Sequence, residues 1–246
     1  MLPKSMRILV LFFLTWYLAS PGLHAQSTQA EWKKGRDQPS HKPVPKEQEA
    51  AKSALPKWTF GINGGYGYRL FRAGNVTTAA NEKYIKSLKS GIVYGGHLSY
   101  YPWTRFGFGL RYEKYQSQAE TEGEISEDVN IQHLSGLFTY RSMLKNHKTA
   151  VLTSLLLGYQ PYQNKTKVGE EQLDFSGNTM GWGVSVGLEH RLGEKFSLNL
   201  TGTAMMGAIY KLKRKTDLNT ATLHLSKDDS VDLSRFSVTL GFGFLK

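Results

Sequence analysis

The chain has 246 residues, which is enough for one domain of ordinary size with appendages. It contains 25 Gly, 13 Tyr, 12 Phe and 5 Trp, a composition that suits strands and tight turns better than a helical bundle. The lack of cysteine excludes a disulfide framework, a thiolate metal site, a cysteine nucleophile and an N-terminal lipid-modified cysteine. The net charge of +11 is spread along the chain without a basic recognition helix, so we expect no nucleic-acid partner.

The first 56 residues are predicted to be a targeting segment followed by a linker. Two basic residues precede an apolar run from Ile8 to Leu18, which is too short to span a membrane as a helix. We therefore predict a signal peptide over residues 1–25, with cleavage after Ala25. Residues 26–56 are polar and proline-containing and cannot bury enough apolar surface to fold, so we expect a disordered periplasmic linker there.

From Trp58 onward the hydrophobic pattern has a period of two residues, which predicts β-strands. The alternation is clearest in the strands that begin near Trp58, Arg105, Met180 and Phe236. Four further strands are expected near residues 90–101, 129–141, 149–162 and 196–210. The phase of the strand at 129–141 slips around Gln132 and His133, which predicts a β-bulge.

The connections between the eight strands alternate in length. Three are short, at residues 102–104, 143–148 and 193–195, and four are long and polar, at residues 72–89, 117–128, 163–178 and 211–230. This alternation is typical of outer-membrane barrels, with turns in the periplasm and loops outside the cell. The predicted fold is therefore all-β: residues 57–246 form an eight-stranded antiparallel transmembrane β-barrel whose C-terminus lies on the periplasmic side.

The two faces of the predicted strands differ in chemistry. One face is apolar with aromatic residues at both ends, as expected of residues at the two membrane interfaces: Trp58, Tyr68, Trp103, Tyr112, Trp182, Tyr210 and Phe244. The other face is rich in glycine and carries charged residues, which we place in the lumen: Arg69, Arg105, Arg111, Glu113, Glu189 and Arg191. We expect these charges to form an ion-pair network that plugs the barrel, and the alternative is a narrow anion-selective pore.

The signal peptide, the eight alternating strands and the terminal segment Phe236–Phe244 together resemble small bacterial outer-membrane barrels of the OmpX or OmpA-barrel kind. The length, the glycine-rich hairpins and the basic balance are closest to the PorT-like outer-membrane β-barrel proteins. The PorT-like resemblance implies an accessory role in protein secretion, with envelope or secretion proteins as partners. We thus expect a non-enzymatic integral outer-membrane protein without a cofactor, structural or partner-binding, in contact with outer-membrane lipid and lipopolysaccharide. The alternative is a conduit for small solutes or hydrophobic molecules.

A lipid A-modifying enzyme is a third hypothesis, based on three His-Leu-Ser triplets. These pair His97 with Ser99, His133 with Ser135 and His224 with Ser226. In a strand, residues i and i+2 share a face, so the histidine could act as a base for the serine, as in outer-membrane lipid A deacylases. The strand phase points the first two pairs into the lumen, away from a lipid substrate, so we expect no enzyme.

Two charged segments in the predicted loops are candidates for contacts at the cell surface. The acidic segment could bridge divalent cations to lipopolysaccharide phosphate, although solvated charge is the simpler interpretation: Glu120, Glu122, Glu124, Glu127 and Asp128. The basic segment could hold anionic lipid headgroups or pair with the acids: Lys211, Lys213, Arg214 and Lys215.

Overall fold

The computed structural model describes residues 55–71, 79–121, 125–216, 219–226 and 229–246. The predicted signal peptide and almost all of the predicted linker lie outside these residues. Eight long strands dominate the described part: β1 (Trp58–Arg69), β2 (Ser90–Tyr100), β3 (Phe106–Thr121), β4 (Ile125–Met143), β5 (Thr149–Val168), β6 (Glu171–Arg191), β7 (Phe196–Met206) and β12 (Arg235–Leu245).

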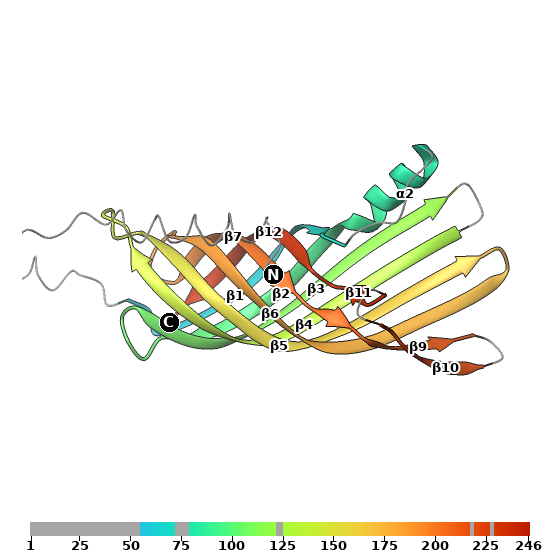
Figure 1. Cartoon of the computed structure of the whole chain (residues 1–246). Coiled ribbons are helices and arrows are strands. Elements are labelled where there is room, and N and C mark those ends of the chain that lie inside the picture. Colours follow the sequence, from blue (N-terminus) through green and yellow to red (C-terminus); the bar gives the residue numbers. More distant parts are fainter. Residues whose placement is uncertain (1–54, 72–78, 122–124, 217–218, 227–228) are drawn as a thin grey trace, which may run out of the picture. The chain divides into compact units, whose positions relative to one another are not determined.

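The eight strands form a closed antiparallel barrel (Figure 1). Each strand from β1 to β7 pairs with the next, and β12 pairs with both β7 and β1. Closure leaves no free edge in the barrel wall. A sheet must lack free edges when its surroundings cannot supply hydrogen bonds to them. The predicted fold and strand number are confirmed.

The two ends of the barrel differ. At one end, the connections are short and span residues 101–105, 144–148 and 192–195. The first and last barrel strands begin and end here, respectively, and they are joined by a hydrogen bond of 2.7 Å from the Trp58 amide to the Lys246 carbonyl. We call this the short-turn end. At the other end, β3, β4, β5 and β6 rise past their neighbours, and we call this the extended end (Figure 1).

The four long connections contain more regular structure than the sequence pattern predicts. Much of 117–128 and 163–178 belongs to strands β3 to β6. The segment 72–89 contains helix α2 (Ala79–Lys89), and 211–230 contains the hairpin of β9 (Lys211–Lys215) and β10 (Thr220–His224). Two short strands, β8 (Ala208–Ile209) and β11 (Val231–Asp232), pair with each other beside it.

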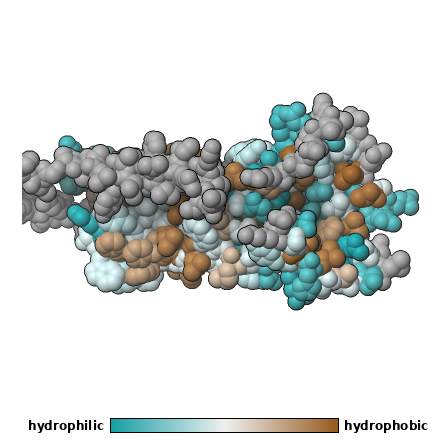
Figure 2. Space-filling view, viewed as in Figure 1, coloured by the Kyte–Doolittle hydropathy of each residue, from teal (hydrophilic) through white to brown (hydrophobic). Residues whose placement is uncertain are grey.

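Strands β3 to β6 continue beyond the predicted membrane-spanning part of the barrel because their apolar residues change from the outer to the inner face along the strand. Over most of the barrel, apolar side chains point outward, and these exposed residues form a continuous apolar belt on every strand. At the extended end, outward residues are polar, and apolar residues point inward instead: Tyr115, Ala119, Val129, Ile131 and Tyr162 are buried. Figure 2 shows the strongly hydrophilic side chains gathered mostly at the extended end.

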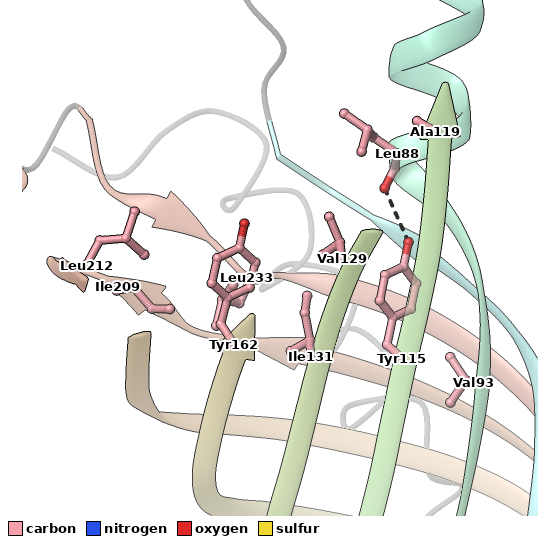
Figure 3. Close-up of a cluster of buried hydrophobic side chains, with 10 residues drawn as sticks. All are labelled: Leu88, Val93, Tyr115, Ala119, Val129, Ile131, Tyr162, Ile209, Leu212 and Leu233. Carbon is pink, nitrogen blue, oxygen red and sulfur yellow. Dashed lines mark hydrogen bonds between the residues drawn. The ribbon is translucent and has the colours of Figure 1, made fainter. Parts of the chain in front are cut away.

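The inward apolar residues of the extended end form a separate hydrophobic core (Figure 3). Ten buried residues make up this extended-end core: Leu88, Val93, Tyr115, Ala119, Val129, Ile131, Tyr162, Ile209, Leu212 and Leu233. They come from the barrel strands, from α2, from the β8–β9 segment and from the segment before β12. The core therefore joins the parts of the extended end into one packed unit.

Helix α2 is fixed to this core rather than stabilised by its own sequence alone. Leu88 is buried in the core, and its carbonyl accepts hydrogen bonds from the Tyr115 and Ser117 hydroxyls, at 3.4 and 3.1 Å. On its exposed side, Lys86 pairs with Glu82 at 2.8 Å, one helical turn away. The helix was not predicted, because its 11 residues lie in a segment that the sequence pattern assigned to a long polar loop. None of the helices among the described residues has the length and apolarity to cross a membrane.

The bulge predicted at Gln132 and His133 is wrong. The register between β4 and β5 is the same before and after these residues, as is the register between β3 and β4. The β4–β5 ladder is interrupted at this level because Pro161, opposite Gln132, has no amide hydrogen to donate. The apparent slip in the pattern is the inversion of polarity described above.

An extra residue lies instead in the segment that follows β7. Trp182 of β6 pairs with Met206, whereas Gly177 of β6 pairs with Leu212, so the segment after β7 has one more residue than β6 between these pairs. Such a bulge reverses the faces of the strand beyond it. Consequently Leu212 points into the extended-end core, and its neighbours in β9 point outward.

Candidate functional site

The central feature of the lumen is a buried charge cluster. Glu113 of β3 is 1% exposed and accepts from Arg111 Nη2 at 2.7 Å and from Arg235 Nη2 at 3.0 Å. Arg235 of β12 is completely buried. Alternation along β3 turns Arg111 and Glu113 to the same inner face, and closure brings β12 within reach across the barrel. A single carboxylate thus compensates two guanidinium groups, and the three side chains fill the lumen.

A second polar cluster lies at the short-turn end. The Arg141 guanidinium lies 4.0 Å from the centroid of the Tyr101 ring. It also donates to the Thr104 carbonyl at 3.2 and 3.3 Å and to the Pro56 carbonyl at 3.1 Å. Buried Glu189 lies within electrostatic range of Arg141. This cluster ties the start of the barrel to the turn between β2 and β3 and occupies the short-turn end of the lumen.

Between the two polar clusters lies a cavity of about 60 Å³. Asn63, His97, Ser99, Arg111 and Asn199 are among the residues that line it. A cavity of this size holds a handful of water molecules. With the extended-end core above it, the described interior is therefore filled at three levels: by the Arg141 cluster, by the Glu113 cluster and by apolar side chains.

The six charges that we placed in one lumen network are divided among different places. Arg111 and Glu113 come together, with Arg235 as the third member. Glu189 lies near half-exposed Arg191 at the short-turn end. Arg69 is buried at the extended end, where its Nη2 donates to the Asp232 carbonyl at 3.2 Å and its guanidinium lies over Phe71. Arg105 is exposed in the turn before β3, so its placement in the lumen is wrong.

Two arginines of the interior were missed. Arg235 directly precedes the predicted start of the last strand, and extending the alternation by one residue would have placed it inside. Arg141 lies at the end of β4, where the supposed phase slip hid its direction. Both are buried, at 0% and 2% exposure. Strand parity was therefore the signal that could have found them.

The seven predicted interface aromatics are all exposed on the outer surface of the barrel. Trp58, Trp103 and Phe244 lie at the short-turn end, where Trp58 packs on Tyr100 with ring centroids 4.6 Å apart. The remaining four lie along the opposite margin of the apolar belt: Tyr68, Tyr112, Trp182 and Tyr210. An apolar belt between two groups of aromatic rings has the form of a membrane-spanning surface.

The histidine–serine pairs lie where their strand phases place them. His97 and Ser99 line the lumenal cavity, and His133 and Ser135 are buried inside the barrel. The Ser135 hydroxyl donates to the Arg111 carbonyl at 3.4 Å, so it is engaged by the backbone. His224 and Ser226 are exposed at the extended end, where the Ser226 hydroxyl donates to Asp229. None of these described pairs faces the apolar belt.

The acidic segment is split by the strands that contain it. Glu120 and Asp128 point outward, whereas Glu127 points inward and accepts from Asn164 at 3.2 Å. Burial of the ring and a hydrogen bond to Glu127 raise the pKa of Tyr84 in α2 above its ordinary value. Glu122 and Glu124 lie outside the described residues. Among those described, no three His, Asp or Glu side chains gather closely enough to hold a metal ion.

The chain aligns with solved outer-membrane proteins, and an alignment with a TM-score above 0.5 supports the barrel fold. A major outer membrane protein from Thermus thermophilus aligns with a TM-score of 0.52 and 14% identity over 76% of this chain and 98% of its own. Neisserial surface protein A aligns at 0.48 and 10% identity, over 77% of this chain and 97% of its own. OprG from Pseudomonas aeruginosa aligns at 0.48 and 14% identity, over 77% and 96%.

Comparison with sequences identifies the family. No curated protein matches the chain significantly. Residues 47–244, however, match the family described as the outer membrane protein beta-barrel domain. The match includes all eight barrel strands except the last residue of β12, and it covers far more than half of the chain. The apolar belt is therefore the surface that contacts the lipid of an outer membrane, and the chain belongs to the outer membrane protein beta-barrel domain family.

Proposed function

We propose that this protein is a non-enzymatic, partner-binding component of the outer membrane and that its extended end presents the binding surface. The observation that carries the proposal is the extended-end core. Loops that only connect strands need no core, whereas ten buried residues here hold strands, helix and hairpin together beyond the apolar belt. Such packing supports a surface of fixed shape, which binding to a partner requires.

The length of the extension agrees with this role. The outward apolar row of β3 stops at Tyr112, yet the strand continues to Thr121, and β5 continues from Tyr159 to Val168. In the proposed orientation, the extended end lies outside the cell, and the short-turn end, with both ends of the barrel sequence, faces the periplasm. The PorT-like resemblance would make the partner a component of protein secretion at the outer membrane.

The conduit hypothesis ranks second. A route through the lumen would have to pass the Glu113 cluster and the Arg141 cluster, and the space between them is about 60 Å³. Passage of a solute larger than water therefore requires charged side chains to leave their partners, which is costly in a barrel interior. The filled interior favours a binding protein over a channel.

The test is site-specific photo-crosslinking in native outer membranes, followed by mass spectrometry. A photoreactive amino acid is introduced at Lys83, Glu120 or Thr222, which are exposed at the extended end. Matched control positions are Lys145 and Glu194, exposed in the turns of the short-turn end. We expect one protein partner to be captured from the extended end and not from the controls.

Two results would contradict the proposal. The first is that the protein stays an uncrosslinked monomer with the photoreactive residue at every tested position, and that only lipid co-purifies with it in mild detergent. The second is capture of the same partner only from the short-turn end, which would transfer the binding surface to the other side of the membrane.

A further inference from the structure

A group of lysines lies on the outer surface of the extended end, directly beyond the apolar belt. We call it the lysine patch, and its members are Lys165 and Lys167 of β5 and Lys211, Lys213 and Lys215 of β9. All five are exposed. The bulge after β7 turns the three β9 lysines outward while Leu212 points into the core, so the fold itself creates the patch.

Strand pairing places these lysines side by side although they are far apart in sequence. Asp174 of β6 lies opposite Lys165 on one side and opposite Lys215 on the other. Lys213 lies opposite Ser176 in the neighbouring row. The β5, β6 and β9 segments therefore present one face on which lysine predominates.

The patch has an excess of uncompensated positive charge. The acids in the same rows are Asp174 and Asp128, which both lie opposite Lys165, and Glu120, which lies two strands from Lys167. Within the described residues, none of the five lysines forms an ion pair within 4.0 Å. Five ammonium groups against three carboxylates still leave a surface that attracts anions.

The patch is continuous with the surface that contacts lipid. Tyr210, at the margin of the apolar belt, directly precedes Lys211, and Tyr159 lies on β5 below Lys165. From Lys211 to Lys215 the charges rise along a tilted strand by about 10 Å. Lysine stems can lie along apolar surface while their ammonium groups reach polar headgroups at different heights.

We propose that the lysine patch binds the phosphate groups of lipopolysaccharide. The family places the chain in the outer membrane, and charges at successive heights above the belt match an anionic lipid whose phosphates occupy more than one level. Phospholipid phosphates lie at a single level and would engage only the lysines nearest the belt. The assignment also gives an orientation, since lipopolysaccharide on the patch puts the extended end outside the cell.

The experiment compares two triple variants of the full-length protein in mild detergent. One is K211Q/K213Q/K215Q in the patch, and the matched control is K145Q/K148Q/K195Q, which removes three exposed lysines at the short-turn end. Affinity is measured for lipopolysaccharide, for the same lipopolysaccharide after enzymatic removal of its phosphates, and for phosphatidylglycerol. Heat-modifiable gel migration and circular dichroism establish that both variants remain folded.

A charge beside an anionic lipid surface contributes about fivefold to affinity, so loss of three patch lysines should weaken lipopolysaccharide binding roughly a hundredfold. The control should bind as the unaltered protein does, and removal of phosphate should abolish the difference between the variants. Equal weakening of both variants, or undiminished binding of dephosphorylated lipopolysaccharide, would overturn the proposal. Equal affinity for phosphatidylglycerol would overturn the assignment to lipopolysaccharide.

Discussion

At the scale of single residues, Glu113 is a buried carboxylate that pairs with two buried arginines. It is the only carboxylate that the described structure pairs with Arg111 and Arg235, and all three side chains are at least nine-tenths buried. Buried charges are tolerated when they are paired, and each unpaired one is costly. The geometry of the lumen therefore depends on one acidic side chain held between two strands that are distant in sequence.

Replacement of Glu113 by Gln should leave two buried guanidinium groups without a counter-charge. We expect the free energy of unfolding to fall by about 3–5 kcal/mol. The measurement is urea unfolding in lipid vesicles, followed by tryptophan fluorescence. The control is Glu120→Gln on the same strand, which is exposed and should change stability by about 0.5 kcal/mol or less. A Glu113→Gln protein as stable as the control would show that Glu113 does not balance these charges.

Sequence alternation predicts the direction of a side chain only where the limits of the strand are known. Arg111 and Glu113 lie well inside β3, so their inward direction follows from parity. Arg105 has the same parity, but β3 begins at Phe106 and Arg105 belongs to the turn. The contact of Arg235 with Glu113 joins residues 122 positions apart, and a two-residue period carries no information about such a pair.

At the scale of the elements, each of the strands β3 to β6 serves two environments in succession. On β4, Leu134 and Phe138 point outward within the apolar belt, and Val129 and Ile131 point inward at the extended end. The alternation of inward and outward side chains is unbroken along the strand. What changes is the face on which the apolar residues lie. A search for outward apolar residues therefore finds the membrane-spanning part of each strand and assigns the remainder to a loop. This is why the positions of β3 to β6 were predicted correctly and their lengths were not, whereas the limits of β1, β2 and β12 agree with the prediction within one or two residues.

The extended-end core should be separable from the membrane-spanning part by mutation. Ile131→Ala removes a fully buried side chain from this core and should cost about 2–5 kcal/mol locally. Hydrogen–deuterium exchange should accelerate in α2 and in the β3–β6 segments of the extended end, while amides of the belt stay protected. Leu134→Ala, three residues away on the outward face, is the control and should leave exchange at the extended end unchanged. Uniform acceleration across the barrel after Ile131→Ala would mean that the two parts unfold as one.

At the scale of the whole molecule, the sequence is sufficient for the architecture but not for the role. Eight alternating segments joined by short and long connections lead to an eight-stranded barrel because only a closed sheet satisfies backbone hydrogen bonds in lipid. The packing of α2, β9 and the β8–β11 pair onto the extended end depends on contacts such as those of Leu88 and Leu233, which join distant segments through a shared core. No local pattern encodes those contacts, although they build the surface to which we assign binding.

The filled interior leads to a prediction about conductance. The Arg141 cluster, the Glu113 cluster and the extended-end core lie in series, so opening any one of them leaves the other two in place. In planar lipid bilayers we therefore expect no stable unitary current from the unaltered protein or from Arg141→Ala, with an open porin recorded in the same apparatus as the positive control. Arg141→Ala isolates the short-turn end, because its contacts to Thr104, Pro56 and Tyr101 do not involve the Glu113 cluster. A steady current through the unaltered protein would require a continuous aqueous path past Glu113, and it would favour the conduit over the partner-binding function.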